Sequence, residues 1–404
     1  MPNPLVHHAY KLTQFFNNWL FPFIICWDDE FKRWKTVENW RRLIPYYILN
    51  WFLIDIFLVG VTVFVFFTAV YRPDTLPFEN AIIFTIISMT FPLSMAVDFT
   101  VYYYSQEFVK VVNWVDNSVE QYFPSDFRKQ WRLGSFSLFL HELKKLQRGR
   151  NFDKDGLLLN QIAFFNGLLF HVVPVLLVWG DWDPLYLVLV VVKLPNTYYT
   201  IPDLTSDSWV KIIRMVVSVL VTHAMFMNFN TLNIIGLNIV QGYVKLLKRL
   251  RDLPLKYSNI LNYKQIHIVA NMVQGAYKLL VAVALLAQFF GIVVGTSVII
   301  VGLRLGNTTL TSVALLVTVS SVLGSTSVLL FGCSWVERTE EVFHSWRWKL
   351  TEKKDGGVIR RQIRGCRKIA LAVGGVGTLD DDIKCGFFQA SIIYTANLLL
   401  AISK

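Results

Sequence analysis

The side chains best placed for chemistry are three consecutive carboxylates, Asp380, Asp381 and Asp382, just before an apolar segment at 386–404. Acidic residues in the first turn of a helix complement its dipole, and Thr378 stands three residues before Asp381, as in a helix cap. If several copies of the segment surround an axis, the same carboxylates form an acidic collar that concentrates cations. Capping is the commoner role for such residues, and both interpretations stay open at this point.

Sequence patterns of enzymes are missing from the chain. It contains no G-x-S-x-G, no H-E-x-x-H, no Walker-type loop and no paired carboxylates within an apolar segment. The glycine-rich run 374–377 is followed by no Lys-Ser or Lys-Thr pair, so it predicts a hinge rather than a phosphate-binding loop. The four cysteines show neither a disulfide framework nor metal-ligand spacing. We therefore expect no enzyme, no cofactor and no metal.

Small and polar residues recur along one face of the last apolar segment. Ala390, Tyr394, Asn397, Ala401 and Lys404 follow one another at intervals of three to four residues. Such a stripe occurs where helices pack closely and where a helix faces a polar lumen. The pattern alone favours close contact between helices over a pore face.

The elements that carry these residues are apolar enough to cross a membrane. Of 404 residues, 54% are hydrophobic and 17% are charged, and about 20 apolar residues of helix span a bilayer core. The chain contains seven such segments, and the terminal segment 386–404 is the last of them. The other six predicted spans are Tyr46–Val70, Ala81–Tyr103, Leu157–Trp179, Trp209–Ile235, Tyr277–Leu303 and Leu310–Cys333.

The positive residues predict the orientation of these spans. Of 39 lysines and arginines, 32 lie before the first span or in the 2–3, 4–5 and 6–7 connections, which places those segments in the cytosol. The amino terminus is then inside and the carboxyl terminus outside. This bias accounts for the net charge of +11, so no nucleic-acid partner is implied. The apolar run 185–194 is too short to span, and we expect it in an outer loop.

The predicted architecture is all-α, with seven transmembrane helices. It comprises a cytosolic segment at 1–45, six spans at 46–334, a cytosolic segment at 335–379 and the last helix at 380–404. Leucine and basic residues alternate at helical spacing in the inner connections. We expect helices 4 to 7 to extend into the cytosol, with helices 4, 5 and 6 in contact there. The alternative is that these basic segments lie on anionic lipid.

A few ionisable residues fall inside the predicted spans. His171 lies in the outer half of the third span, where a hydrogen-bonded structural histidine and a donor in a ligand pocket are both open interpretations. Lys211 and Arg214 lie near the outer end of the fourth span, and we expect their charged ends to reach the interface.

The chain resembles the insect-type chemoreceptors, the seven-helix odorant and gustatory receptors of arthropods. The specific match covers about 45 residues at 360–404, and the topology matches over the whole chain. A basic segment with Arg364-Gly365-Cys366-Arg367-Lys368, taken as a helix, precedes a glycine-bearing turn. A final helix with Tyr394-Thr395 follows and ends abruptly. Gustatory receptors usually have Thr before Tyr and end in Gln-Phe, so the chain resembles a divergent member.

The resemblance implies a ligand-gated, nonselective cation channel of four subunits in the plasma membrane. The subunits are identical or include a co-receptor, and the partners are a small organic ligand, permeant cations and lipid. The last helix would line the pore, with Tyr394 on it and a constriction around Asn397, Leu400 and Ala401. A ligand pocket is implied in the outer half of helices 2 to 6. Its candidate residues are Phe84, His171, Trp179, Phe290 and Ser320.

Two rival functions remain from the sequence. A G-protein-coupled receptor would need its amino terminus outside and a cytosolic tail, and the charge distribution opposes both. A transporter or a nonchannel membrane scaffold is the second alternative. Transporters usually show internal repeats or broken helices around a midplane site, and neither pattern is evident in the sequence.

Overall fold

The computed structural model of the chain describes residues 4–18, 23–51, 91–122, 154–181, 208–351, 357–375 and 377–402, with isolated positions between 56 and 67, 140 and 147, and 183 and 186. Most of these residues are helical, as expected, but two small antiparallel hairpins that the sequence analysis did not predict accompany the helices. The described helices are α1 (Pro4–Asn17), α2 (Trp40–Tyr47), α5 (Phe91–Tyr122), α8 (Lys154–Trp179), α11 (Ser208–Asp252), α12 (Tyr257–Leu305), α13 (Thr308–Thr351), α14 (Gly357–Arg364) and α15 (Asp381–Ile402). The strands are β1 (Ile25–Asp28), β2 (Arg33–Thr36), β3 (Ala372–Val373) and β4 (Gly377–Thr378).

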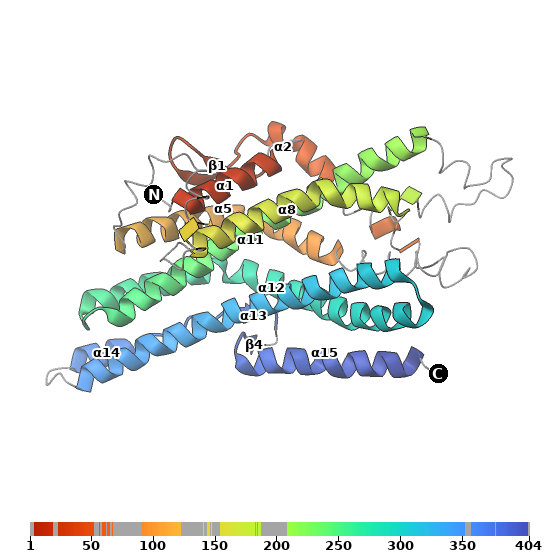
Figure 1. Ribbon diagram of the computed structural model, residues 1–404. Helices are drawn as coiled ribbons and strands as arrows, with labels where there is room; N and C mark the ends of the chain where they lie inside the picture. The colour runs from red at the N-terminus through yellow and green to blue at the C-terminus, as the bar shows by residue number, and fades with distance from the viewer. Residues whose placement is uncertain are drawn as a thin grey trace.

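Three long helices form the body of the molecule. α11, α12 and α13 contain 45, 49 and 44 residues, which corresponds to roughly 65–75 Å each and about twice the apolar thickness of a bilayer. α13 runs beside α12 and also contacts α11 (Figure 1). Among the described residues, the helices long and apolar enough to cross a membrane are Tyr257–Leu305, Leu310–Thr351 and Asp381–Ala401. The expected helical extensions beyond the apolar segments are confirmed for α11, α12 and α13. The last helix, α15, was also expected to extend, but it begins at Asp381, about one turn before its apolar segment.

The apolar parts of α12 and α13 approach closely because glycines of α12 face hydroxyl-bearing residues of α13. A Cβ atom at Gly295 would lie 2.3 Å from Thr318 Oγ1, and one at Gly302 would lie 2.6 Å from Thr311 Oγ1. The Thr318 hydroxyl donates to the carbonyl oxygen of Ala314 at 2.8 Å, which satisfies it within its own helix. Small residues and internally bonded hydroxyls allow this contact in an apolar environment.

The charged parts of the three helices also contact one another, at the end of the bundle that carries α14, which we call the α14 end. Arg251 Nη1 of α11 lies 2.9 Å from Glu341 Oε2 of α13. Lys349 Nζ donates to the carbonyl oxygens of Arg251 and Leu253 at 2.7 and 2.8 Å. The rings of Tyr263 on α12 and Trp346 on α13 lie 5.7 Å apart. These contacts confirm that the basic segments pack together.

The amino-terminal segment folds onto this bundle instead of forming a loose tail. The Asn113 side chain of α5 holds strand β2 at both backbone groups of Trp34: its Oδ1 accepts from the Trp34 N–H at 2.9 Å, and its Nδ2 donates to the Trp34 carbonyl at 2.8 Å. The Trp34 ring packs against Trp27 and Tyr10, at centroid distances of 5.6 and 4.8 Å. An asparagine side chain thus replaces a neighbouring strand.

A carboxylate links three helices beneath this aromatic cluster. Asp116 of α5 accepts hydrogen bonds from Asn238 Nδ2 of α11 at 2.8 Å and from the Tyr10 hydroxyl of α1 at 3.3 Å. Burial raises the pKa of Asp116 from 3.8 to about 6, and these two hydrogen bonds only partly offset the effect. The carboxylate therefore exchanges its proton within the range of mildly acidic solutions.

We expect Asp116→Asn to be more stable than wild type above pH 6 and to lose this advantage toward pH 4, because Asp116 has a folded pKa of about 6 and an unfolded value of 3.8. Between these values the folded chain binds more protons, so its stability falls as the pH rises through the window. The difference is on the order of 1–3 kcal/mol.

Melting temperatures of the two purified proteins in detergent, compared across this pH range, check the prediction. Burial lowers the pKa of His7 to about 4, and its titration acts in the opposite direction. Because His7 is present in both proteins, the difference between them isolates Asp116. Parallel melting curves at every pH would contradict this account.

The connection from α14 to α15 is extended, which corrects one expectation. The basic helix ends at Arg364, and residues 366–371 are not helical. Ile369, Leu371 and Val373 are buried, whereas the alanines between them are partly exposed. A period of two is the pattern of an extended strand, not of a helix. The expected hinge at 374–377 lies in the β3–β4 hairpin, where Gly374 and Gly377 have φ values of 51° and 147°.

Candidate functional site

The start of α15 is fixed by a buried leucine and an aspartate cap. Leu379 is fully buried against α13, where a Cβ atom at Gly332 would lie 2.2 Å from Leu379 Cδ1. Asp380 Oδ1 then accepts the backbone N–H of Ile383 at 3.0 Å. The expected cap at Thr378 is therefore wrong, because Thr378 belongs to strand β4 and the helix begins at Asp381.

The three carboxylates differ in their surroundings. Asp380 is used as the cap, and Asp381 lies 3.6 Å from Lys384 Nζ one turn along the helix. Asp382 is exposed, and within the described part of the chain no ion pair involves it. A helix-capping role therefore accounts for Asp380, whereas Asp382 is left available to solvent or to cations.

Within the described part of the chain, contacts with α15 lie along one face of the helix. Phe289 of α12 packs against Phe387 and Tyr394, at centroid distances of 6.0 and 5.7 Å, and Ser391 between them is buried. Only 6% of the residues in the apolar stretch of α15 are buried. Figure 1 shows α15 beside α12 and α13 at the edge of the bundle, and none of the described helices or strands lies on its other side.

The residues expected to line a pore lie on the flank and the outer face of this helix. The Tyr394 ring contacts Phe289 of α12, although 58% of the residue is exposed. Asn397 and Ala401 are exposed, and Leu400 is 64% exposed. At about 100° per residue, the four positions span an arc of about 120°. Gln389, which the sequence analysis did not single out, lies near the middle of the outer face.

Three of the candidate pocket residues, Trp179, Phe290 and Ser320, are exposed in the single chain. Trp179 at the end of α8 is 85% exposed, and Phe290 of α12 is 42% exposed. Ser320 of α13 is also exposed. His171 lies on α8, and Phe84 is outside the described residues. The structure thus places Trp179, Phe290 and Ser320 on three different helices, and the pocket assignment stays a prediction.

A buried ionic cluster joins α8 to α11 and corrects the expectation for Arg214. The guanidinium is 1% exposed, and its Nε and Nη2 donate to Asp183 Oδ2 at 2.8 and 2.6 Å. Nη2 also donates to Asp181 Oδ1 at 2.6 Å and to the Val178 carbonyl at 3.2 Å, and the guanidinium lies 4.8 Å from the Tyr186 ring centroid. The charged end of Arg214 therefore does not reach solvent, because two carboxylates that follow α8 meet it.

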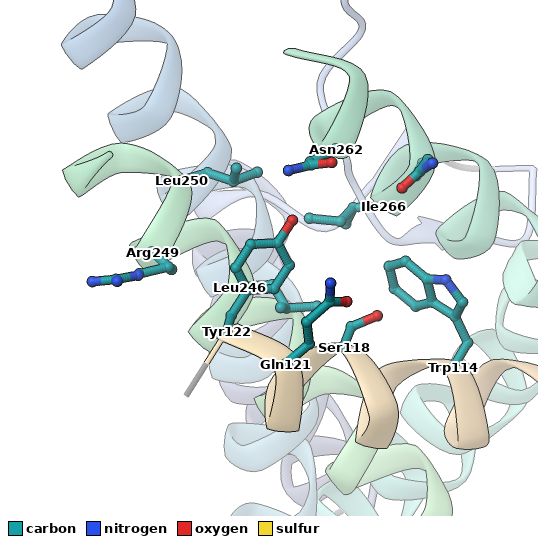
Figure 2. Close-up of a pocket in the computed structure, with 10 residues that line it drawn as sticks. Trp114, Ser118, Gln121, Tyr122, Leu246, Arg249, Leu250, Asn262 and Ile266 are labelled. Atoms are coloured by element: carbon teal, nitrogen blue, oxygen red, sulfur yellow. The ribbon is translucent and has the colours of Figure 1, made fainter. Parts of the chain in front are cut away.

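A cavity of about 170 Å³ lies at the α14 end, between α5, α11 and α12. Figure 2 shows Trp114 and Tyr122 of α5 at opposite sides of it, with Ser118 and Gln121 between them. Residues of α12, among them Asn262, close the other side. The sequence analysis did not predict this cavity, because its walls come from three segments that are distant in the sequence.

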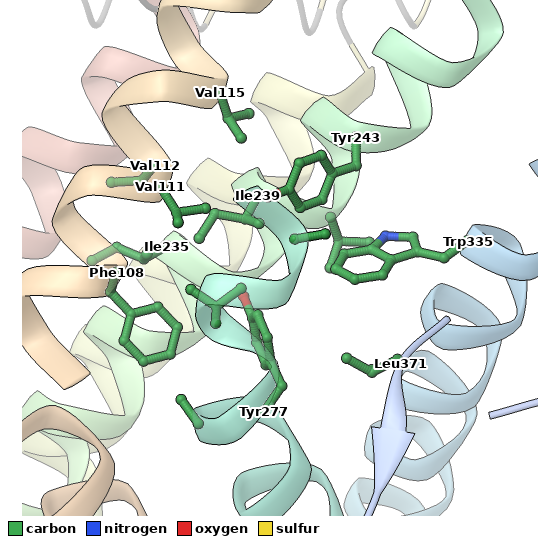
Figure 3. Packing of buried hydrophobic residues seen from close by; sticks show 14 of the residues in the cluster. Phe108, Val111, Val112, Val115, Ile235, Ile239, Tyr243, Tyr277, Trp335 and Leu371 are labelled. Atoms are coloured by element: carbon green, nitrogen blue, oxygen red, sulfur yellow. The ribbon is translucent and has the colours of Figure 1, made fainter. Parts of the chain in front are cut away.

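An aromatic hub connects four helices to the segment that leads into α15. The hub consists of Phe108 of α5, Tyr243 of α11, Tyr277 of α12 and Trp335 of α13. Its rings meet edge to face, at 5.6 Å for Phe108–Tyr277, 6.4 Å for Tyr277–Trp335 and 5.1 Å for Tyr243–Trp335. Leu371, just before β3, lies beside Tyr277 and Trp335 in Figure 3. The hub and the segment before α15 therefore belong to one buried hydrophobic cluster.

This arrangement of long helices with a peripheral carboxyl-terminal helix is the insect chemoreceptor-type fold, which confirms the resemblance seen in the sequence. Two solved structures of the insect olfactory receptor OR5 from Machilis hrabei match nearly the whole chain. One has a TM-score of 0.57 at 14% identity, over 97% of this chain and 96% of that chain. The other, in complex with eugenol, has a TM-score of 0.55 at 12% identity, over 98% and 97%. No family profile and no curated protein matches the sequence.

Proposed function

We propose that this chain is a subunit of a ligand-gated cation channel opened by a small organic molecule. Four subunits, identical or combined with a co-receptor, would surround one pore in the plasma membrane. The fold, shared with an olfactory receptor at low identity, supports a chemoreceptor. The receptor solved with eugenol further supports a small organic ligand for this chain.

The observation that carries the proposal is the exposed polar side of α15. Gln389 and Asn397 present amides on a helix whose outer surface beyond the first turn is otherwise largely apolar, and both are exposed in the single chain. Amides are costly against lipid, so such residues face a polar cavity or a neighbouring helix. Four copies of α15 around an axis would place these amides toward water or toward each other.

Coupling to the ligand would pass through the aromatic hub. The open state of the channel must bind the ligand more tightly than the closed state, because only a difference in affinity shifts the equilibrium between the two states. The backbone N–H of Gly374 donates to the Lys278 carbonyl of α12 at 3.1 Å, so the hairpin before α15 is attached to α12. A ligand that shifts α12 would thus move the base of the pore helix.

The ligand pocket of this channel would lie among the helices at the end opposite α14. Phe84, His171, Trp179, Phe290 and Ser320 are its candidate residues. Aromatic and aliphatic surfaces with few orienting hydrogen bonds recognise small organic molecules by shape and area. Trp179 and Phe290 offer such surface and are exposed in the single chain.

Recording from oocytes that express the chain alone tests the proposal. Application of eugenol and a panel of small odorants and tastants should evoke a cation current. A carboxyl-terminal epitope should be stained without permeabilisation, because the proposed topology places it outside. Staining only after permeabilisation would rule out this topology. If the current is absent, co-expression with a co-receptor separates a mixed assembly from a nonchannel protein.

Two aspartate variants separate an acidic collar from helix capping. We expect Asp382→Asn to reduce the single-channel cation conductance without a change in melting temperature, because Asp382 is exposed and makes no described ion pair. Asp380→Ala should instead cost about 1 kcal/mol of stability through loss of the cap. Unchanged conductance in Asp382→Asn would leave the carboxylates with a structural role only.

A further inference from the structure

We propose that the cavity between α5, α11 and α12 is a binding site for an uncharged molecule with a single aromatic ring and an amide or hydroxyl group. The site lies at the α14 end, near the last turns of α11, whereas Arg214 lies in the second turn of the same helix. Leu250 and Arg214 are 36 residues apart on α11, or about 54 Å. The site is therefore remote from the proposed ligand pocket and does not depend on it.

The size of the cavity sets the size of the ligand. Its volume is about 170 Å³, and an apolar cavity of about 150 Å³ in another protein accepts benzene. Leu246, Leu250 and Ile266 contribute an apolar floor, and each is at most 2% exposed. A ring of six atoms with one small substituent matches this space.

The walls favour an aromatic ring. Trp114, Ser118 and Tyr122 follow one another at intervals of four residues, which puts them on one face of α5. Figure 2 shows the Trp114 and Tyr122 rings on either side of an open space, with the Ser118 hydroxyl between them. A ring placed there can meet both aromatic side chains edge to face or offset.

The polar groups at the cavity are available for hydrogen bonds. Ser118 and Gln121 of α5 face Asn262 of α12 across the space, and Gln265 of α12 also lines the cavity. Within the described ranges, no hydrogen bond joins any of these four side chains to another protein group. Three amides and a hydroxyl supply both donors and acceptors. An amide or hydroxyl on the ligand could bond to them in place of water.

The charges around the cavity favour an uncharged ligand. Arg249 is the one charged residue among the described residues of the lining, and Figure 2 shows its side chain directed away from the space. The described lining contains no carboxylate to bind a cation. A charged ring compound would lose hydration without gaining an ionic partner inside the cavity.

Saturation-transfer NMR on the full chain in detergent micelles tests the site, with benzamide as the probe. We expect transfer to benzamide, with weaker transfer to benzylamine and benzoate at the same concentration. Gln121→Leu should weaken benzamide binding about fivefold, because one hydrogen bond contributes about 1 kcal/mol. Gln106→Leu is the matched control: an exposed glutamine of the same helix that does not line the cavity.

Trp114→Leu gives a second measure, since it removes an aromatic wall and leaves the amides. We expect it to lower benzamide binding while Gln106→Leu keeps the wild-type affinity. Melting temperatures of all variants identify any that fail to fold. Absence of transfer to benzamide in the wild type would overturn the proposal and leave a water-filled cavity. Equal binding by wild type, Gln121→Leu and Trp114→Leu would also overturn it, because the probe would then occupy another site.

Discussion

Replacing Arg214 with methionine should destabilise the folded chain by about 3–5 kcal/mol, because the substitution leaves a buried carboxylate without its partner. Asp183 is fully buried and receives two hydrogen bonds from the guanidinium. Methionine approximates the length of the arginine stem and supplies no charge. The loss should appear as a lower melting temperature in detergent and as less protein at the cell surface.

Lys211→Met is the control for this prediction. Lys211 precedes Arg214 by three residues on α11 and is exposed, so its replacement should change stability by no more than about 0.5 kcal/mol. Equal melting temperatures for the two variants would show that the ionic cluster contributes little.

A double variant identifies the cause of the loss. Adding Asp183→Asn to Arg214→Met removes the uncompensated charge and keeps an oxygen that can accept the Tyr186 N–H, now bonded at 3.0 Å. We expect part of the stability to return, because a buried pair replaced on both sides costs less than a pair broken on one side. If the double variant is no more stable than the single one, lost contacts around the guanidinium are responsible, not the unpaired charge.

The sequence predicted the long helices well because their signals are local. Leucine and basic residues at helical spacing, as in the segment 244–253, indicate a helix whatever surrounds it. The amino-terminal hairpin was missed although Ile25, Trp27 and Trp34 alternate with polar residues. Its docking depends on Asn113, which follows Trp34 by 79 positions and meets it only in the folded chain.

The errors at the candidate sites also have physical causes. Arg214 was expected, like Lys211, to extend its charged end to the interface, and Asp181 and Asp183 beyond α8 were the available signal for its partners. Thr378 has the residue type and spacing of a cap, but the β3–β4 hairpin delays the start of the helix by two residues. The pore face stays a prediction, because a pore would need several chains. A single chain leaves it exposed.

Cysteines on the exposed side of α15 should make the channel sensitive to a cationic thiol reagent. We expect the reagent to abolish most of the ligand-evoked current in Asn397→Cys and Leu400→Cys, because each of four subunits would add a positive group to the pore. These positions are about 60° apart on the helix. The native Cys385 is exposed on α15 and is first replaced by serine.

Ile392→Cys tests whether loss of current requires a position on the predicted pore side of α15 or only an exposed position. Ile392 is 71% exposed in the single chain, yet it lies about 140° around the helix from Asn397. If subunits surround an axis on the Asn397 side, Ile392 faces lipid or a neighbouring subunit, and its cysteine should leave the current unchanged. Ser391→Cys, buried against α12, reports the background reaction.

The pattern of reactivity then distinguishes the two roles of the polar stripe. Loss of current at Asn397 and Leu400 together with protection at Ile392 requires a water-filled space on one side of α15 only. Equal loss of current at all three positions would mean that α15 does not turn one particular side toward a pore. Protection at all three would mean that the amides of α15 are used for contact between subunits, and the pore would then have to be formed by other helices.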